Sequence, residues 1–230
     1  MTNKLIFLYL LFATFMATGQ TISGYVYDAV TNEPLESVAV YFDNTTVGTT
    51  TNSEGYFTLD YTAVIRSTLV YSYLGYTIQY DEDYRSKTQV KIKLKVNVNQ
   101  LDAVVIEYDD GLTRQQKLRL FRREFLGRSL SAKSCKIVNE EDLILRYDKD
   151  NRLLSATATK PLVLWNNYLR YKVLYDLMEF QATFKYADIA DEYFSTDTVI
   201  FVGTSFFKDL NKTYKQRSER RRNKVYLGSV

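Results

Sequence analysis

The chain of 230 residues contains no histidine, and this absence excludes several kinds of catalytic site. Histidine is the commonest general base and the commonest metal ligand, and it is the third member of Ser and Cys triads. Classical zinc hydrolases and His-dependent nucleophilic enzymes are therefore excluded for this stretch of chain. We predict no catalytic residues, no metal site and no cofactor, and we do not expect an enzyme.

Cysteine and proline are also scarce. Cys135 is the only cysteine, so an exported form of the chain has no internal disulfide and depends on packing for its stability. Only 2 prolines occur, against 20 tyrosines and 13 phenylalanines. Because aromatic side chains with polar tips suit half-exposed pleated sheets, this composition favours a β-rich protein.

The N-terminus carries an apolar run. Lys4 precedes residues 5–16, which are almost entirely apolar, and small residues follow up to Gly19. This pattern predicts a secretory signal peptide over residues 1–19, cleaved before Gln20, and hence an exported protein. The alternative is an uncleaved anchor, which needs about 20 apolar residues and is disfavoured by the shortness of the run.

Short segments with strand character follow from Ile22 onward, separated by turns. They cover residues 22–26, 38–42, 47–51, 56–59, 68–73, 76–80 and 89–94. The turn at Ser53 to Gly55 places glycine where a positive φ is needed between two strand-forming segments. About seven short strands at this spacing predict a sandwich or barrel and not a βαβ fold.

Four segments of this strand-rich region carry a family resemblance. They are Ile22–Asp28, Thr31–Val40, Gly48–Phe57 and Leu69–Tyr76. Together they resemble the carboxypeptidase-like regulatory domain, which implies an all-β, transthyretin-like, seven-stranded sandwich over residues 20–107. The zinc catalytic domain that accompanies this sandwich in metallocarboxypeptidases needs His ligands, which the chain lacks.

The same resemblance implies a location in the cell. The module also begins many TonB-dependent transporters and other surface proteins of Gram-negative bacteria, so we expect the periplasm or the outer membrane and cell surface. Leu101–Glu107 is predicted as an edge strand, and a similar phrase leads toward the plug domain in such transporters. The residues that follow do not resemble a plug. We place the domain boundary at 108–113.

The second domain, residues 113–230, is predicted to begin with a helix. Thr113 is a suitable N-cap, and Leu118, Phe121 and Phe125 follow at helical spacing. The cations that lie largely on the other face are Arg114, Lys117, Arg119, Arg122 and Arg123. One interpretation is a basic helix that binds acidic lipid or lipopolysaccharide. The favoured interpretation is an ordinary helix whose cations are solvated.

Strand patterns return after this helix. They cover residues 143–147, 152–159, 161–165, 169–177, 180–186 and 198–202. Residues 169–177 alternate most regularly between apolar and polar positions. The second half is therefore predicted to be an α+β domain dominated by an antiparallel sheet.

The second half also carries a resemblance of its own. Its segments are Phe121–Gly127, Cys135–Asn139, Leu153–Leu162, Asn167–Tyr171 and Arg221–Gly228. They resemble the uncharacterised region that often follows the sandwich in exported proteins of this family. Such relatives tend to have glycine where this chain has Arg170, and they tend to run on past the terminal Tyr-Leu-Gly phrase. The chain is thus either a shortened member or a fragment truncated at its C-terminus.

Acidic loops and the cysteine are candidate sites. Carboxylates cluster at residues 81–83, 140–142, 148–150 and 188–192, but none has the spacing of an EF-hand, which favours solvated loop acids over a calcium site. Cys135 lies near Lys133 and Lys136, so a lowered thiol pKa and a nucleophile are one interpretation. A buried cysteine that acts as a small apolar residue is the favoured one.

A basic tail and a set of tyrosines are the other candidates. Residues 208–224 are rich in Lys and Arg, which suits either lipopolysaccharide phosphates or a partner, or else a solvated helix. Export argues against nucleic acid as the partner. The alternating tyrosines are either a carbohydrate platform or a cover over the core. They are Tyr71, Tyr73, Tyr76, Tyr80 and Tyr84.

These observations predict a non-enzymatic, exported cell-envelope protein with a binding, scaffolding or assembly role. Its expected partner is an envelope protein or a glycan, with outer-membrane association and no nucleic acid. One alternative is the N-terminal part of a larger outer-membrane β-barrel or TonB-dependent transporter-like protein. A second alternative is an accessory part of a peptidase.

Overall fold

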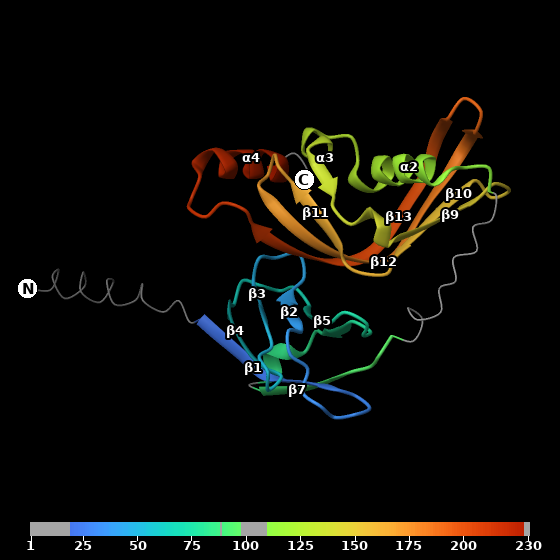
Figure 1. The fold of residues 1–230 in the computed structure, drawn as a ribbon. Coiled ribbons are helices and arrows are strands. Elements are labelled where there is room, and N and C mark those ends of the chain that lie inside the picture. The colour runs from blue at the N-terminus through green and yellow to red at the C-terminus, as the bar shows by residue number, and fades with distance from the viewer. Residues whose placement is uncertain (1–18, 88, 98–109, 228–230) are drawn as a thin grey trace, which may run out of the picture. The chain divides into compact units, whose positions relative to one another are not determined.

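The computed structural model describes residues 19–87, 89–97 and 110–227, and the chain divides into two compact units (Figure 1). The first unit ends in the sequence at Asn97, and most of the second follows it. The predicted signal peptide, except for Gly19, lies outside the described residues, and so does the predicted strand Leu101–Glu107. None of the helices in the described part of the chain is long and apolar enough to cross a membrane.

The first unit consists of two sheets. Its elements are β1 (Gly19–Asp28), β2 (Ala39–Phe42), β3 (Gly48–Thr50), β4 (Tyr56–Thr62), β5 (Leu69–Ser72), β6 (Gln79–Asp81), η1 (Tyr84–Ser86) and β7 (Gln89–Leu94). One sheet has the order β4-β1-β7 and the other the order β3-β2-β5-β6. β1 pairs antiparallel with β4 but parallel with β7. Each predicted strand has a counterpart, although β6 begins three residues later than predicted.

Alternation in the strands of the first unit produces a single core. In β1 the buried positions include Ile22 and Val26, and in β4 they include Phe57 and Leu59, as the period of two requires. Side chains from β2 and β5 of the other sheet belong to the same buried cluster. The unit is therefore held together by two sheet faces that pack on one another, without a disulfide.

Close packing of two strand backbones requires glycine at position 24 in β1. A Cβ at this position would lie 2.3 Å from the carbonyl oxygen of Val90 in β7. Only glycine allows β1 and β7 to approach this closely.

The second unit is an α+β unit with one antiparallel sheet. Its elements are α2 (Arg114–Leu126), α3 (Leu130–Lys133), β8 (Cys135–Ile137), η3 (Glu140–Asp142), β9 (Leu143–Asp148), β10 (Leu153–Ala158), β11 (Leu162–Asn166), β12 (Tyr171–Asp188), β13 (Tyr193–Asp209) and α4 (Gln216–Leu227). The strand order is β8-β11-β12-β10-β9, and β13 pairs with β12. Taken with the first unit, the described chain is mostly antiparallel β-sheet with a few helices, as predicted at this coarse level.

The long hairpin of β12 and β13 differs from the prediction. The two predicted strands at 169–177 and 180–186 are one strand of 18 residues, β12. Its register against β13 shifts between Leu177 and Glu179. Such a bulge shifts the apolar residues from odd-numbered to even-numbered positions along the strand. One continuous strand therefore has the sequence pattern of two separate strands. The predicted short strand at 198–202 is likewise part of a strand of 17 residues, β13, whose burial alternates only weakly because much of the strand is exposed on both faces.

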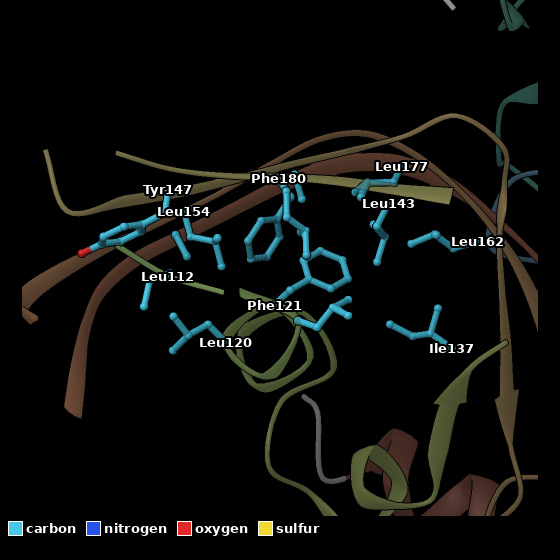
Figure 2. Close-up of a cluster of buried hydrophobic side chains, with 14 of the residues drawn as sticks. Leu112, Leu120, Phe121, Ile137, Leu143, Tyr147, Leu154, Leu162, Leu177 and Phe180 are labelled. Carbon is cyan, nitrogen blue, oxygen red and sulfur yellow. The ribbon is translucent and has the colours of Figure 1, made fainter. Parts of the chain in front are cut away.

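Helix α2 covers one face of this sheet. Its N-terminus is closed by a capping box in which Thr113 and Gln116 bond to each other's backbone N–H groups, as the N-cap prediction requires. Figure 2 shows Phe121 projecting from α2 toward Phe180 of β12. Both rings are fully buried, with centroids 4.8 Å apart. Each ring buried in this way contributes about 1.5–3 kcal/mol, so this contact is a main attachment of the helix.

Candidate functional site

A polar groove lies on the second unit between α2 and the first residues of β13. Two neighbouring cavities, of about 200 and about 440 Å³, share Arg123, Glu192 and Phe194 as lining residues. The smaller is also lined by Gln116, Arg119 and Leu120, and the larger by Arg128, Tyr193, Ser195 and Thr196. The shared residues make the two cavities parts of one groove.

Helical periodicity brings one wall of the groove together. Gln116, Arg119, Leu120 and Arg123 are spaced by three or four residues, so they lie on one face of α2. The opposite wall is fixed by Phe194, which is 6% exposed and packs edge-on against other rings of the core. Residues next to Phe194 in the strand are thereby held at the surface.

Glu192 is tied to the helix at the junction of the two cavities. Arg119 Nη2 donates to both carboxylate oxygens of Glu192, at 2.7 and 2.6 Å, and the Gln116 amide donates to one of them at 2.9 Å. Hydrogen bonds from Gln116 and Arg119 hold the pKa of Glu192 below its ordinary value. Glu192 is therefore a carboxylate that already has its cation.

The other two arginines of the groove differ from each other. Arg123 forms an ion pair with Glu124, and its Nη2 lies 3.4 Å from Thr196 Oγ1. The Thr196 hydroxyl donates to Glu124 at 2.9 Å, which completes a small network. Arg128, just beyond the C-terminus of α2, is exposed and makes no hydrogen bond or ion pair with any residue in the described ranges. Its guanidinium is free to bind an anion.

The remaining cations of α2 have partners within the unit, and the prediction of a solvated basic face is wrong for one of them, Lys117. Lys117 is 8% exposed, and its Nζ lies 2.7 Å from Asp110 Oδ2. Arg114 donates to the backbone carbonyls of Glu140 and Leu143, and Arg122 pairs with the Glu140 carboxylate. The acceptors come from segments distant in the sequence, so only the fold shows them. These cations already have partners within the unit, which disfavours the interpretation of a lipid-binding face.

Comparison with known proteins bears on the first unit. A family model described as CarboxypepD_reg-like domain matches residues 22–106. Residues 22–106 are similar to a CarboxypepD_reg-like domain. The match confirms the resemblance predicted from the four motifs between Ile22 and Tyr76. It ends before residue 110, where the described residues of α2 and the large sheet begin, and the resemblance predicted for that region stays a prediction.

The other comparisons add no relative. No curated protein matches the chain. Among solved structures, a crystal structure of a 9R-lipoxygenase from Cyanothece aligns at 12% identity with a TM-score of 0.27. The alignment covers 79% of this chain but only 39% of the lipoxygenase chain. A similarity of this extent supports no conclusion about fold or function.

The predicted tyrosines of the first unit lie mostly in or against its core. Tyr71 and Tyr84 are buried in its core, Tyr73 and Tyr76 pack against that core, and only Tyr80 is exposed, at 40%. The interpretation as a cover over the core is confirmed for four of the five. The Tyr76 hydroxyl donates to Asp28 at 2.7 Å, and this bond raises the pKa of Tyr76 to about 12.

The prediction of solvated loop acids is wrong for Asp81, which is buried, whereas the other acids of these loops are mostly exposed. Asp81 is 7% exposed and pairs with Lys87 at 2.8 Å. Asp142 pairs with Lys160 at 3.2 Å, and Asp148 accepts hydrogen bonds from Asn151. Across residues 19–87, 89–97 and 110–227, no three Asp, Glu, Cys or His side chains come together in a way that would hold a metal ion.

Cys135 is not an activated thiol. It lies at the start of β8, half-buried, and packs against the core of the second unit. Burial raises the pKa of its thiol, so the interpretation that neighbouring lysines lower it is wrong. The favoured interpretation, a small apolar residue, fits the packing, although the side chain is only partly covered.

The basic tail is divided between anchoring and exposed cations. Arg222 donates to both Asp209 oxygens at 2.7 and 3.0 Å, and its guanidinium lies 3.8 Å from the Tyr171 ring centroid. Arg221 lies 4.8 Å from the Tyr168 ring centroid. These contacts attach α4 to the sheet. The interpretation as a solvated helix holds for the exposed cations of α4, which are Arg217, Arg220 and Lys224.

Proposed function

We propose that the protein is a non-enzymatic, exported component of the cell envelope with a binding, scaffolding or assembly role. The observation that carries the proposal is the match of residues 22–106 to a domain whose name marks it as regulatory and not catalytic. The sequence supports it further, because the chain has no histidine to serve as a zinc ligand or general base. The second unit then presents the binding surface.

We also propose a domain architecture for this function. Two sheets that share one core support a transthyretin-like, seven-stranded sandwich over residues 20–107. The capped start of α2 supports a second domain that begins at Thr113. In this arrangement the sandwich is the accessory module and the α+β domain carries the specific contacts.

Export is the first part of the proposal to test. The apolar run 5–16, followed by small residues up to Gly19, supports cleavage before Gln20. The full chain is expressed in a Gram-negative host, the envelope and cytoplasm are separated, and the N-terminal residue is sequenced. We expect a chain that begins at Gln20 in the envelope fraction. A Leu8→Arg, Leu11→Arg variant is the control, because two charges in the run should block export. Uncleaved wild-type chain in the cytoplasm would overturn the proposal.

The non-enzymatic role has a separate test. Purified mature chain is incubated with a panel of peptides and glycans, and products are measured by mass spectrometry. We expect no turnover. Hydrolysis of any substrate, sustained over several turnovers and lost in heat-denatured protein, would refute this part of the proposal while leaving export untouched.

A further inference from the structure

The groove between α2 and β13 has an excess of cations, which the family match does not explain. Among its lining residues, Arg119, Arg123 and Arg128 are cations and Glu192 is the one carboxylate. Glu192 is matched by Arg119 and Arg123 by Glu124, so the charge of Arg128 is left without a counter-ion in the described part of the chain. A cation without a counter-ion in a groove attracts an anionic group.

The hydroxyl groups beside Arg128 narrow the class of ligand. Tyr193 and Ser195 line the same cavity, and their hydroxyls make no hydrogen bond with the residues that the structure describes. The guanidinium of Arg128 has five N–H donors, and the two hydroxyls add one donor each. This set of donors is larger than the two oxygens of a carboxylate readily accept. A phosphate group has more acceptor oxygens and suits a mixed set of guanidinium and hydroxyl donors.

From this donor set we propose that the groove binds a phosphate group, with Arg128 as its principal cation and Ser195 and Tyr193 as hydroxyl donors. The larger cavity, of about 440 Å³, is wide enough for the phosphate. The adjoining cavity of about 200 Å³ offers the apolar surfaces of Leu120 and Phe194 to the part of the ligand next to it. The ligand is therefore a phosphate ester of a small molecule or lipid headgroup, or phosphate itself.

The second basic surface of the unit is a poorer candidate. In α4 the two arginines nearest the sheet, Arg221 and Arg222, are used to attach the helix. Its other cations are exposed on a convex helix surface, and none lines either of the cavities that form the groove. Arg217 on α4 is therefore a matched control for Arg128, because both are exposed arginines on the same unit.

The test is binding of mature chain to three probes, measured by calorimetry and by vesicle co-sedimentation. The probes are inorganic phosphate, vesicles of phosphatidylcholine with phosphatidic acid, and vesicles of phosphatidylcholine alone. We expect saturable binding to phosphate, to the phosphatidic acid vesicles, or to both, and none to phosphatidylcholine alone. Binding to phosphate identifies a soluble ligand, whereas binding only to the acidic vesicles identifies a lipid headgroup.

Variants decide whether the groove is responsible. R128A should weaken binding at least about tenfold, the effect of one lost charge-assisted hydrogen bond, while R217A should leave it unchanged. E192Q should tighten binding, because it removes the carboxylate that competes for the groove's cations. Equal losses in R128A and R217A, weaker binding by E192Q, or no saturable binding of any probe by the wild type would overturn the proposal. The proposal does not depend on export, so it stands or falls separately from the fractionation experiment.

Discussion

Replacing Lys117 by methionine tests whether α2 is fixed to the sheet by a buried ion pair. Lys117 Nζ lies 2.7 Å from Asp110 Oδ2, and the two side chains are only 11% and 9% exposed. Asp110 also accepts hydrogen bonds from the backbone N–H groups of Leu112 at 3.0 Å and Tyr147 at 3.2 Å. The carboxylate therefore stays in place when Lys117 is removed, but it stays there without the cation that pairs with it.

The structure sets the size of the expected effect. Removal of one partner from a buried pair costs about 3–5 kcal/mol, because a charge is left uncompensated. The two backbone hydrogen bonds to Asp110 still stabilise the carboxylate, so we expect a loss near 3 kcal/mol, at the lower end of that range of about 3–5 kcal/mol. With a urea slope of about 1–3 kcal/mol per M, the unfolding midpoint falls by about 1–3 M.

Trp165 makes the measurement specific to the second unit. It is the only tryptophan of the chain and lies in β11, 47% exposed. Urea unfolding followed by its fluorescence therefore reports on the sheet to which α2 is attached. The D110N/K117M double variant should recover much of the loss, because it removes both charges and keeps a similar shape.

Arg119→Met is the matched control on the same helix. Arg119 also forms an ion pair, but its side chain and that of Glu192 are 53% and 47% exposed, so solvent screens the pair. We expect the midpoint of R119M to stay close to that of the wild type. If K117M moved the midpoint no further than R119M does, the argument from burial would be refuted.

Three further predictions concern single residues. Arg170 has a φ of +61°, in the left-handed region that costs an L-residue about 1–2 kcal/mol, so R170G should raise the urea midpoint measured by fluorescence. The buried Tyr71 hydroxyl has no hydrogen-bond partner in the described structure, so Y71F should leave stability unchanged or raise it by about 1 kcal/mol in thermal unfolding, and a marked loss would contradict this. Hydrogen bonds from Arg222 hold the pKa of Asp209 below its ordinary value of 3.8. The stability from this bond is therefore present above pH 3.8 and lost as the pH falls through the lowered value, so the difference in melting temperature between wild type and D209N should shrink in acid.

The positive φ of Arg170 gives a physical reason for the residue type expected there in relatives. Relatives are expected to have glycine at this position, and the structure shows a turn between β11 and β12 that favours glycine. The carbonyl of Arg170 also accepts hydrogen bonds from the backbone of Leu210 and from Arg222. These bonds fix the turn, so the side chain present here is tolerated at a cost in stability.

The candidate groove marks the limit of prediction from sequence. The cations of α2 and the acidic loop at 188–192 are both visible in the sequence, but only as separate features. Nothing in the sequence pairs Arg119 with Glu192, which lie 73 residues apart. No sequence pattern predicts the positions of Phe194 and Ser195, because the burial of β13 alternates only weakly.

Local patterns are enough to predict most elements. The alternation of β1 and β4, the cap at Thr113 and the apolar stripe that places Phe121 in the core depend on neighbours in the sequence, and the period of each element repeats within a few residues. The absence of histidine limits the available chemistry through composition alone. The strand segments and the family resemblance of residues 22–106 follow from the same short-range information.

Only the tertiary structure decides which charges meet. Lys117 is expected in water because its helix face is polar, yet it is buried and paired with Asp110, whose carboxylate also accepts a hydrogen bond from the backbone N–H of Tyr147. The bulge near Leu177 could not be predicted from the sequence either, because register is a property of two paired strands and not of one. Sequence thus determines the elements and their buried faces, whereas the ion pairs, the continuous hairpin and the groove with its free Arg128 depend on contacts between distant segments.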